Sequence, residues 1–233
     1  MILEELVEKL RKIREAGFIK TVRAHDGGVG NTLESLLEIK ENNIRLPDTG
    51  EIEIKAKRIE SNSMLTLASK SPLPRGVNKI LFRHYSHVAE DNIRKLYTTI
   101  YGSTVNPQGF RVVFENDKLI LQNRNNITAY WPTGLLLESL KTKANKILLA
   151  YAETKGKKGS PNEMFHYIEA YLLAELDLDR IKKALENGKL KFDIRIGADK
   201  AGKRIGVYHD HGTAMRISKQ DYPELYEEHC RIL

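Results

Sequence analysis

The chain has 233 residues, of which 41% are hydrophobic and 30% charged, and its formal net charge is +7. This composition excludes dominant disorder, no run approaches the ~18 apolar residues that a bilayer crossing needs, and a single cysteine excludes an internal disulfide or a thiolate zinc cluster. The sequence therefore predicts a cytoplasmic globular protein with no membrane partner.

The first predicted element is an amphipathic helix over residues 2–15, where apolar side chains recur at helical spacing. A glycine-rich turn at 25–30 follows. Asn31 and Glu34 then form the pattern of a capping box, which predicts a second helix that begins at Asn31 and continues to about residue 37.

Predicted strands and helices alternate through the rest of the chain. A turn at 46–50 leads into a strand at 51–58, in which apolar and charged residues alternate. The further predicted elements are a hairpin of 111–114 and 119–122, a strand at 146–151, a helix from a second capping box at 160–163 to about residue 174, a helix at 178–187, and strands at 190–196 and 214–217 joined by a basic loop. These elements indicate a mixed α/β domain with two lobes.

Positive charge is concentrated in two segments. Lys182–Lys219 contains ten basic residues against four acids, and Lys141–Lys158 contains six lysines against one acid. A localised basic face is the electrostatic footprint of a protein that binds the phosphate backbone of nucleic acid. A solvated lysine-rich surface is the alternative interpretation.

The strand at 51–58 carries the residues that suggest chemistry. Glu53 and Lys55 are two positions apart, so their side chains project from one face, and Asp48 in the preceding turn can reach that face. Two carboxylates, with the backbone carbonyl of Ile54, can hold Mg²⁺, and the lysine can position or help to deprotonate an attacking water. An alternating Glu/Lys strand on a solvent-facing sheet has the same pattern.

The order of motifs from Gly28–Glu34 through Pro47-Asp48 to Glu53–Lys55 resembles that of the PD-(D/E)xK endonucleases related to the mismatch-repair nickase MutH. In that group an acidic residue on the first core helix joins the strand carboxylates around the metal, and Glu34 occupies the matching position. The alternative role of Glu34 is to cap its helix. The resemblance implies a mixed β-sheet flanked by helices, with two lobes around a DNA cleft.

Other segments resemble the MvaI/BcnI restriction endonucleases more closely, and the MvaI branch in particular. The resemblance runs in order from about Gly28 to Ile217 and is poor over about 90–144. The matching segments are Leu65–Leu67, Lys70–Pro72, Pro74–Gly76, Asp193–Gly197 and Tyr208–Ile217. That family implies a type II, sequence-specific DNA endonuclease that acts as a monomer with one metal site and cuts one strand per event.

Known members of this family read CC-N-GG-type sites. Ala68-Ser69 stands where the BcnI branch has a histidine that senses the central base pair, which favours a central A·T pair here. We expect one endonuclease domain over 1–233, with a catalytic lobe at about 1–150 and a DNA-recognition lobe at about 151–233. A cognate DNA methyltransferase is then the expected genetic partner.

Asp193 and Arg195 share one face of a predicted strand and suit the reading of a G·C pair, with Arg216 as a second arginine for guanine. The alternative role of Asp193 and Arg195 is to form a structural ion pair. The remaining candidate DNA contacts are His209, Asp210 and His211 toward bases, Lys200, Lys203 and Arg204 toward phosphates, and Lys70 and Arg75 from the resemblance. A transition-metal site is the alternative for the two histidines and their neighbour.

Three functions remain open at this point. The first is a Mg²⁺-dependent restriction endonuclease acting on double-stranded DNA, in which Asp48, Glu53 and Lys55 carry the chemistry and Glu34 supports them. The second is a repair nickase that needs partner proteins. The third is a DNA-binding protein without catalysis, for which acids facing the phosphates would be unfavourable unless a cation intervened.

Overall fold

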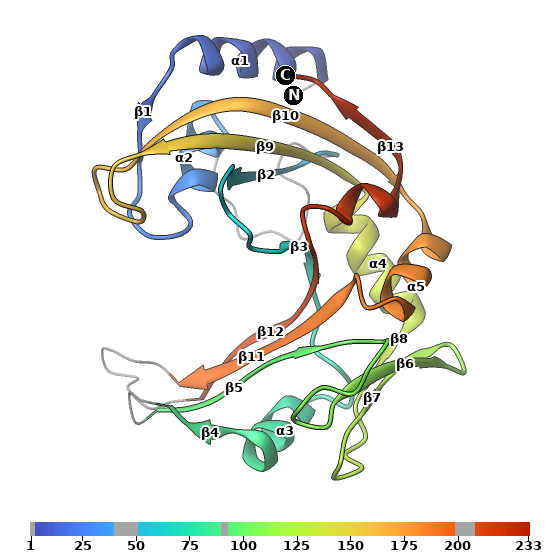
Figure 1. The fold of residues 1–233 in the computed structure, drawn as a ribbon. Helices are drawn as coiled ribbons and strands as arrows, with labels where there is room; N and C mark the ends of the chain where they lie inside the picture. Colours follow the sequence, from blue (N-terminus) through green and yellow to red (C-terminus); the bar gives the residue numbers. More distant parts are fainter. Residues whose placement is uncertain (1–2, 40–50, 90–92, 199–207) are drawn as a thin grey trace. The chain divides into compact units, whose positions relative to one another are not determined.

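The computed structural model describes residues 3–39, 51–89, 93–198 and 208–233 (Figure 1). The chain forms two compact units and passes between them more than once. The first unit comprises Met1–Ser63, Thr142–Leu176 and Tyr226–Leu233, and the second comprises Met64–Lys141 and Asp177–Leu225. The predicted boundary near residue 150 lies within the strand Lys146–Lys155, which pairs with the strand Met164–Leu176 in the first unit.

The first unit is a mixed five-stranded sheet with helices on one face. Its elements are α1 (Leu3–Glu15), β1 (Ile19–Lys20), α2 (Gly28–Leu36), β2 (Glu53–Arg58), β9 (Lys146–Lys155), β10 (Met164–Leu176) and β13 (Tyr226–Arg231). The strand order is β1-β10-β9-β2, and β13 also pairs with β10. β2 runs parallel to β9, with Glu53 opposite Ile147, whereas the other pairs are antiparallel.

The core of this unit lies between the sheet and its two helices. α1 packs along β10 and α2 against β2 (Figure 1). Leu6 and Leu10 of α1 and Leu33 of α2 are fully buried against the apolar side of β2, β9 and β10. Ile54 of β2 belongs to the same cluster, so the side chains next to it in the strand, Glu53 and Lys55, point to the opposite face.

The second unit contains two antiparallel sheets, two complete helices and most of a third helix. Its elements are β3 (Leu65–Ser69), α3 (Val77–Tyr85), β4 (His87–Val88), β5 (Arg94–Ile100), β6 (Arg111–Glu115), β7 (Lys118–Gln122), β8 (Tyr130–Pro132), most of α4 (Thr133–Ala144), α5 (Leu178–Glu186), β11 (Lys191–Ala198), β12 (Tyr208–Ile217) and the 3₁₀ turn η2 (Tyr222–Leu225). The strand orders are β3-β12-β11-β5-β4 and β6-β7-β8. Trp131 of β8 packs against Phe192 of β11, with ring centroids 5.2 Å apart.

One sequence-based helix prediction was wrong, and a second placed the start of its helix three residues too late. The segment predicted as a helix from 160 to 174 forms the long strand β10, because its residues pair with β9 over the whole length and with β1 and β13 on the other edge. The helix predicted to begin at Asn31 begins at Gly28, with Gly27 at its N-cap and no side-chain cap. Glu34 therefore lies inside α2 and does not cap it.

Glu163, predicted as a helix-capping residue, instead forms a buried ion pair. Its two oxygens accept hydrogen bonds from Arg58 Nε at 2.6 Å and Arg58 Nη2 at 2.7 Å, and from the Gly159 amide at 2.8 Å. Arg58 also donates to the Asp26 carbonyl and lies 5.3 Å from the centroid of the Phe165 ring. This pair joins the end of β2 to the start of β10.

We expect Glu163→Gln to lower the free energy of unfolding by about 3–5 kcal/mol, because it leaves the buried Arg58 charge uncompensated. The control is Glu169→Gln, whose carboxylate is 26% exposed and lies 3.7 Å from Arg231; we expect about 1 kcal/mol or less. Urea unfolding of both variants measures the difference. Similar losses in the two variants would contradict a special role for the buried pair.

The same pair predicts a pH dependence. The hydrogen bond from Arg58 is the main cause that lowers the pKa of Glu163 below its ordinary value. A lowered folded-state pKa means that the stabilisation is complete above the unfolded pKa of about 4.3 and is lost as the pH falls through the folded value. The free energies of unfolding of the wild type and of Glu163→Gln should therefore converge only below the unfolded pKa of about 4.3, as the pH falls through the lower folded value.

Candidate functional site

The charged face of β2 holds the residues predicted to carry the chemistry. Lys55 Nζ lies 3.2 Å from Glu53 Oε1, and Lys143 Nζ, from the last turn of α4, lies 3.1 Å from Glu53 Oε2. The Glu53 side chain is only 13% exposed, and those of Lys55 and Lys143 are 20% and 29% exposed. One partly buried carboxylate is therefore held between two ammonium groups.

The structure brings Glu53 and Lys55 together as predicted from their spacing. Ile54 lies between them with its side chain in the core, and Asp48 lies outside the described residues. Glu34 is on α2, which packs against β2, and its Oε1 lies 3.8 Å from the position that a Cβ at Gly30 would take. Lys143 was missed as a site residue, because only the parallel pairing of β2 with β9 reveals that it lies beside Glu53.

The donor set at β2 suits a hard cation. Within the described residues no group of three or more His, Cys, Asp or Glu side chains could hold a metal ion. Glu53 nevertheless attracts two cations in a partly buried position, and carboxylate and carbonyl oxygens are the ligands that Mg²⁺ prefers. Of the predicted metal ligands, Glu53 and Ile54 are described and Asp48 is not, so the set of three stays a prediction.

The second cluster lies on one face of the β3-β12-β11-β5-β4 sheet. In β11, Phe192, Ile194 and Ile196 are buried on one side, so Asp193 and Arg195 share the other. Arg216 Nη1 of β12 donates to Asp193 Oδ2 at 2.6 Å, and Asp193 is buried. The predicted arginine and aspartate thus lie together, although the ion pair joins Asp193 to Arg216 across the strands.

Several polar atoms of this face are buried without a hydrogen-bond partner in the described part of the chain. They are Asp193 Oδ1, Arg195 Nε and Arg216 Nε. A buried polar atom that makes no hydrogen bond costs about 1–3 kcal/mol, so such atoms need an explanation. Acceptors and donors of this kind on one sheet face are consistent with a polar ligand that completes the hydrogen bonding.

A β-bulge in β12 involves His211 and Gly212, at the end of the three residues predicted at 209–211. Ile194 and Ile196 of β11 pair with Thr213 and Asp210, so two residues of β12 lie opposite one of β11, and Gly212 adopts φ +76°. Glycine adopts this left-handed conformation readily, whereas a residue with a side chain would be strained in it. β12 begins at Tyr208, so the residues before the bulge form a strand where a loop was expected.

His209 and His211 point to the same face, with ring centroids 4.3 Å apart in an edge-to-face arrangement. Asp210 points to the other face, since it pairs with the buried Ile196 and its Oδ2 accepts a hydrogen bond from Asn78 of α3 at 2.7 Å. The Gly212 amide donates to Asp210 Oδ1 at 2.8 Å. Asp210 therefore stabilises the bulge from the opposite face of the sheet, and its side chain does not lie beside the two histidines.

The Asp210 carboxylate also affects its neighbour Tyr208. Burial is the main cause that raises the pKa of Tyr208 to about 12, and the negative charge of Asp210 is the second. The neutral Tyr208 hydroxyl donates to Asp210 Oδ2 at 3.4 Å. Asn78, which shares that acceptor, was not singled out in the sequence, because its contact depends on a partner 132 residues away.

The remaining predicted contacts are divided between described and undescribed residues. Lys70 follows β3, and its amide donates to the Thr213 carbonyl at 2.9 Å, which anchors it beside the bulge. Arg75 is exposed just before α3. Lys200, Lys203 and Arg204 lie outside the described residues. Tyr97 of β5, missed from the sequence, lies opposite Arg195 and is 50% exposed.

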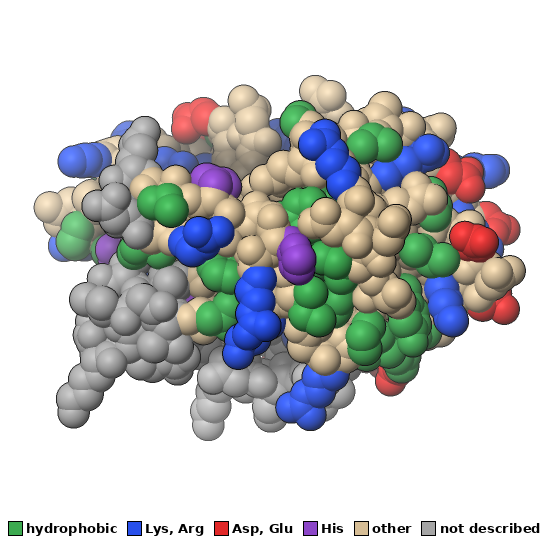
Figure 2. All heavy atoms as spheres, turned by 90° about the horizontal axis from the view of Figure 1, so that it is seen from below, with side chains coloured by type: hydrophobic (Ala, Val, Ile, Leu, Met, Phe, Trp, Pro, Cys, Tyr) green, Lys and Arg blue, Asp and Glu red, His purple; other side chains and the backbone are tan. Residues whose placement is uncertain are grey.

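The opposite side of this sheet has a different surface. α3 covers it, β4 forms the edge of the sheet beside β5, and Figure 2 shows this side with basic side chains dispersed among apolar ones instead of gathered in one patch. Ile80 and Val88 are among the exposed apolar residues of these two elements. The polar cluster of β11 and β12 is therefore the better candidate for binding.

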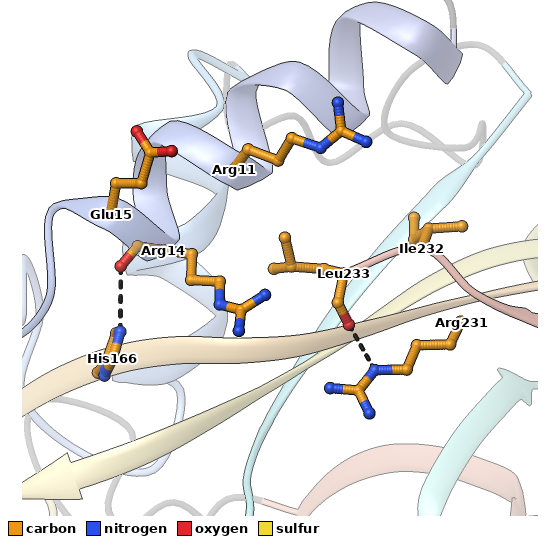
Figure 3. A pocket seen from close by; sticks show the side chains of 7 residues that line it. All are labelled: Arg11, Arg14, Glu15, His166, Arg231, Ile232 and Leu233. Carbon is orange, nitrogen blue, oxygen red and sulfur yellow. Dashed lines mark hydrogen bonds between the residues drawn. The ribbon is translucent and has the colours of Figure 1, made fainter.

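A hollow in the first unit is basic but is not the site. Arg11, Arg14, His166 and Arg231 line it near the end of the chain (Figure 3). Arg231 lies 3.7 Å from Glu169 and donates to the Leu233 carbonyl, and His166 contacts the Arg14 carbonyl at 3.0 Å. These contacts engage Arg231 and His166, and the hollow contains none of the residues around Glu53.

Comparisons with known proteins identify relatives over nearly the whole chain. The model of the MvaI/BcnI restriction endonuclease family matches residues 7–226. A solved complex of the restriction endonuclease MvaI with a cognate DNA substrate is 31% identical, covers 100% of both chains and has a TM-score of 0.87. MvaI in the absence of DNA is 32% identical, with 99% of this chain and 97% of that chain covered and a TM-score of 0.58. Among curated proteins nothing matches significantly.

Proposed function

Because the chain belongs to the MvaI/BcnI restriction endonuclease family and is thus a type II site-specific deoxyribonuclease, we propose that it hydrolyses duplex DNA with Mg²⁺ at a short CC-N-GG-like site. The observation that carries the chemistry is the partly buried Glu53 carboxylate beside Lys55 on β2. The cognate DNA substrate in the solved MvaI complex supports double-stranded DNA as the partner. No helix within the described ranges combines the length and hydropathy that a membrane span needs.

Asp48, Glu53 and the Ile54 carbonyl would hold the metal, with Glu34 supporting the site. Mg²⁺ at this position would supply a Lewis acid that makes a water molecule easier to deprotonate. Lys55 would orient the attacking water through its ammonium group, which the neighbouring Glu53 oxygen keeps in place at 3.2 Å. Hydrolysis would join the water oxygen to phosphorus and break the bond from phosphorus to the ester oxygen, which leaves with one proton from the water.

The polar face of β11 and β12 would read the bases. Arg216 can donate two hydrogen bonds to guanine O6 and N7, while Asp193 can accept from cytosine N4. Their ion pair fixes the guanidinium in one orientation before DNA arrives. Arg195, His209 and His211 extend the same face. Lys70, Arg75, Lys200, Lys203 and Arg204 would contact phosphates, and we assign Asp210 the task of holding the bulge.

We further propose a central A·T pair, because Ala68-Ser69 offers no histidine to the central position. Four duplexes that differ only in the central pair of a CC-N-GG site test this assignment. We expect cleavage of the A·T and T·A duplexes at rates at least about tenfold above the G·C duplexes, the effect of one or two contacts to a base pair. Equal rates on all four would contradict it.

Strand-by-strand cutting by a monomer is also part of the proposal. A supercoiled plasmid with one site should first give nicked circles and then linear DNA, with rates proportional to enzyme concentration. A rate that rises with the square of the concentration would contradict a monomer, and nicked circles as the final product would favour a repair-type nickase. A cognate DNA methyltransferase is the proposed genetic partner that protects the host site.

A further inference from the structure

Lys143 reaches Glu53 through the connection between α4 and β9. It is the last but one residue of α4, and β9 begins at Lys146. The parallel register places Ile147 of β9 opposite Glu53 of β2, so the end of α4 lies beside the carboxylate. A cation also suits the C-terminal end of a helix, where the helix dipole is negative. The position of Lys143 is therefore set by the sheet itself.

The two lysines contact different oxygens of the Glu53 carboxylate. Lys55 Nζ contacts Oε1 at 3.2 Å and Lys143 Nζ contacts Oε2 at 3.1 Å. A divalent cation that binds Glu53 through one of these oxygens competes with the ammonium already there. Lys143 is the more exposed of the two and comes from a separate element, so it can move while Lys55 stays on the strand.

We propose that Lys143 is a second catalytic lysine, which neutralises Glu53 in the absence of substrate and binds a non-bridging phosphate oxygen of DNA when the site is loaded. This inference rests on the proposed function. The phosphate gains negative charge as the water oxygen bonds to phosphorus and before the ester oxygen departs with its electron pair and takes up a proton. An ammonium beside that charge lowers the barrier.

The variant that tests the proposal is Lys143→Met, with Lys141→Met as the matched control. Lys141 is an exposed lysine two residues earlier in the same helix. At saturating Mg²⁺, we expect single-turnover cleavage by Lys143→Met to fall by about 10²–10³-fold, the effect of removing one donor to a transition-state oxygen. Lys141→Met should stay within about threefold of the wild type, since a single exposed charge has little local effect.

A second readout does not depend on cleavage. Ca²⁺ titration of the DNA-free protein by calorimetry should show tighter binding to Lys143→Met than to Lys141→Met, by roughly fivefold, because a competing ammonium has been removed from Glu53. Specific DNA binding in Ca²⁺ should weaken by about three- to tenfold, the effect of one lost phosphate contact. If Lys143→Met is less stable than the wild type, both measurements are repeated with Lys143→Gln.

Two failures can be distinguished. If the wild type cleaves and Lys143→Met cleaves within about threefold of Lys141→Met at saturating Mg²⁺, Lys143 is only a counter-ion and this inference is overturned. If the wild type itself shows no Mg²⁺-dependent cleavage, the proposed function fails first. Unchanged Ca²⁺ affinity in Lys143→Met would also contradict the competition at Glu53.

Discussion

Lys55→Ala and Glu53→Gln are expected to abolish cleavage while specific DNA binding in Ca²⁺ remains within about threefold of the wild type, because the proposed recognition contacts lie on β11 and β12 and not on β2. Lys55 lies 3.2 Å from Glu53, and both side chains are partly buried on β2. Loss of a group that positions or deprotonates the nucleophile costs about 10²–10⁴-fold in rate. Single-turnover cleavage of a labelled duplex, with binding measured in parallel, gives both quantities.

The control for these variants is Lys157→Ala, an exposed lysine in the first unit, which should cleave at nearly the wild-type rate. Asp48→Ala should behave as Glu53→Gln does if Asp48 is the second carboxylate ligand. Retained cleavage in both Lys55→Ala and Asp48→Ala would refute the assignment of the catalytic residues. Loss of specific binding together with cleavage would instead indicate that these variants have lost their fold.

Arg216→Ala should weaken specific binding by about 10–100-fold, the equivalent of 1–3 kcal/mol for one bidentate contact to guanine, with a smaller effect on non-specific binding. The variant also leaves the buried Asp193 carboxylate without its 2.6 Å partner. Competition between cognate duplex and random DNA at one fixed salt concentration measures the specificity ratio.

Arg216→Lys separates base reading from simple charge. Lysine keeps the positive charge beside Asp193 but lacks the planar fork that contacts guanine at two atoms. We expect it to lose most of the specificity ratio as Arg216→Ala does, whereas Lys182→Ala on α5 should weaken binding slightly for all sequences. A specificity ratio that survives in Arg216→Lys would show that Arg216 contacts only the backbone of the DNA.

Elements with strong local signals were predicted well. The helix at 2–15, the strand at 51–58, the hairpin at 111–122 and the helix at 178–187 all occur, with ends shifted by a few residues. In the last of these, Asp177 caps α5 by accepting a hydrogen bond from the Arg180 amide at 2.7 Å. The mixed α/β architecture and the family were likewise confirmed.

The error at 160–174 has a physical cause. The residues Ser160-Pro161-Asn162-Glu163 match the pattern of a helix start. In the structure, however, Glu163 forms an ion pair with Arg58, which lies 105 positions away in the sequence. Pairing with β9 on one edge and with β1 and β13 on the other then commits the segment to a strand. Pairing with distant strands outweighs the local preference for a helix, and it cannot be predicted from a short window of sequence.

The candidate site shows the same division between local and distant signals. Glu53 and Lys55 could be placed on one face because strand alternation is a local rule. Lys143 approaches Glu53 across 90 residues, and Asn78 approaches Asp210 across 132, so neither contact is visible in spacing. The separation of Asp210 from His209 and His211 follows from the alternation of the strand, which the predicted loop concealed.

The most direct test of the account is digestion of unmethylated phage DNA by the purified protein, with Mg²⁺ in one reaction and EDTA in the other. We predict discrete fragments only with Mg²⁺, whose sequenced ends share one CC-N-GG-like site. A protein that binds this DNA in a salt-sensitive manner but yields no Mg²⁺-dependent product on prolonged incubation would contradict the account, because the acids and lysines at β2 would then serve no hydrolysis.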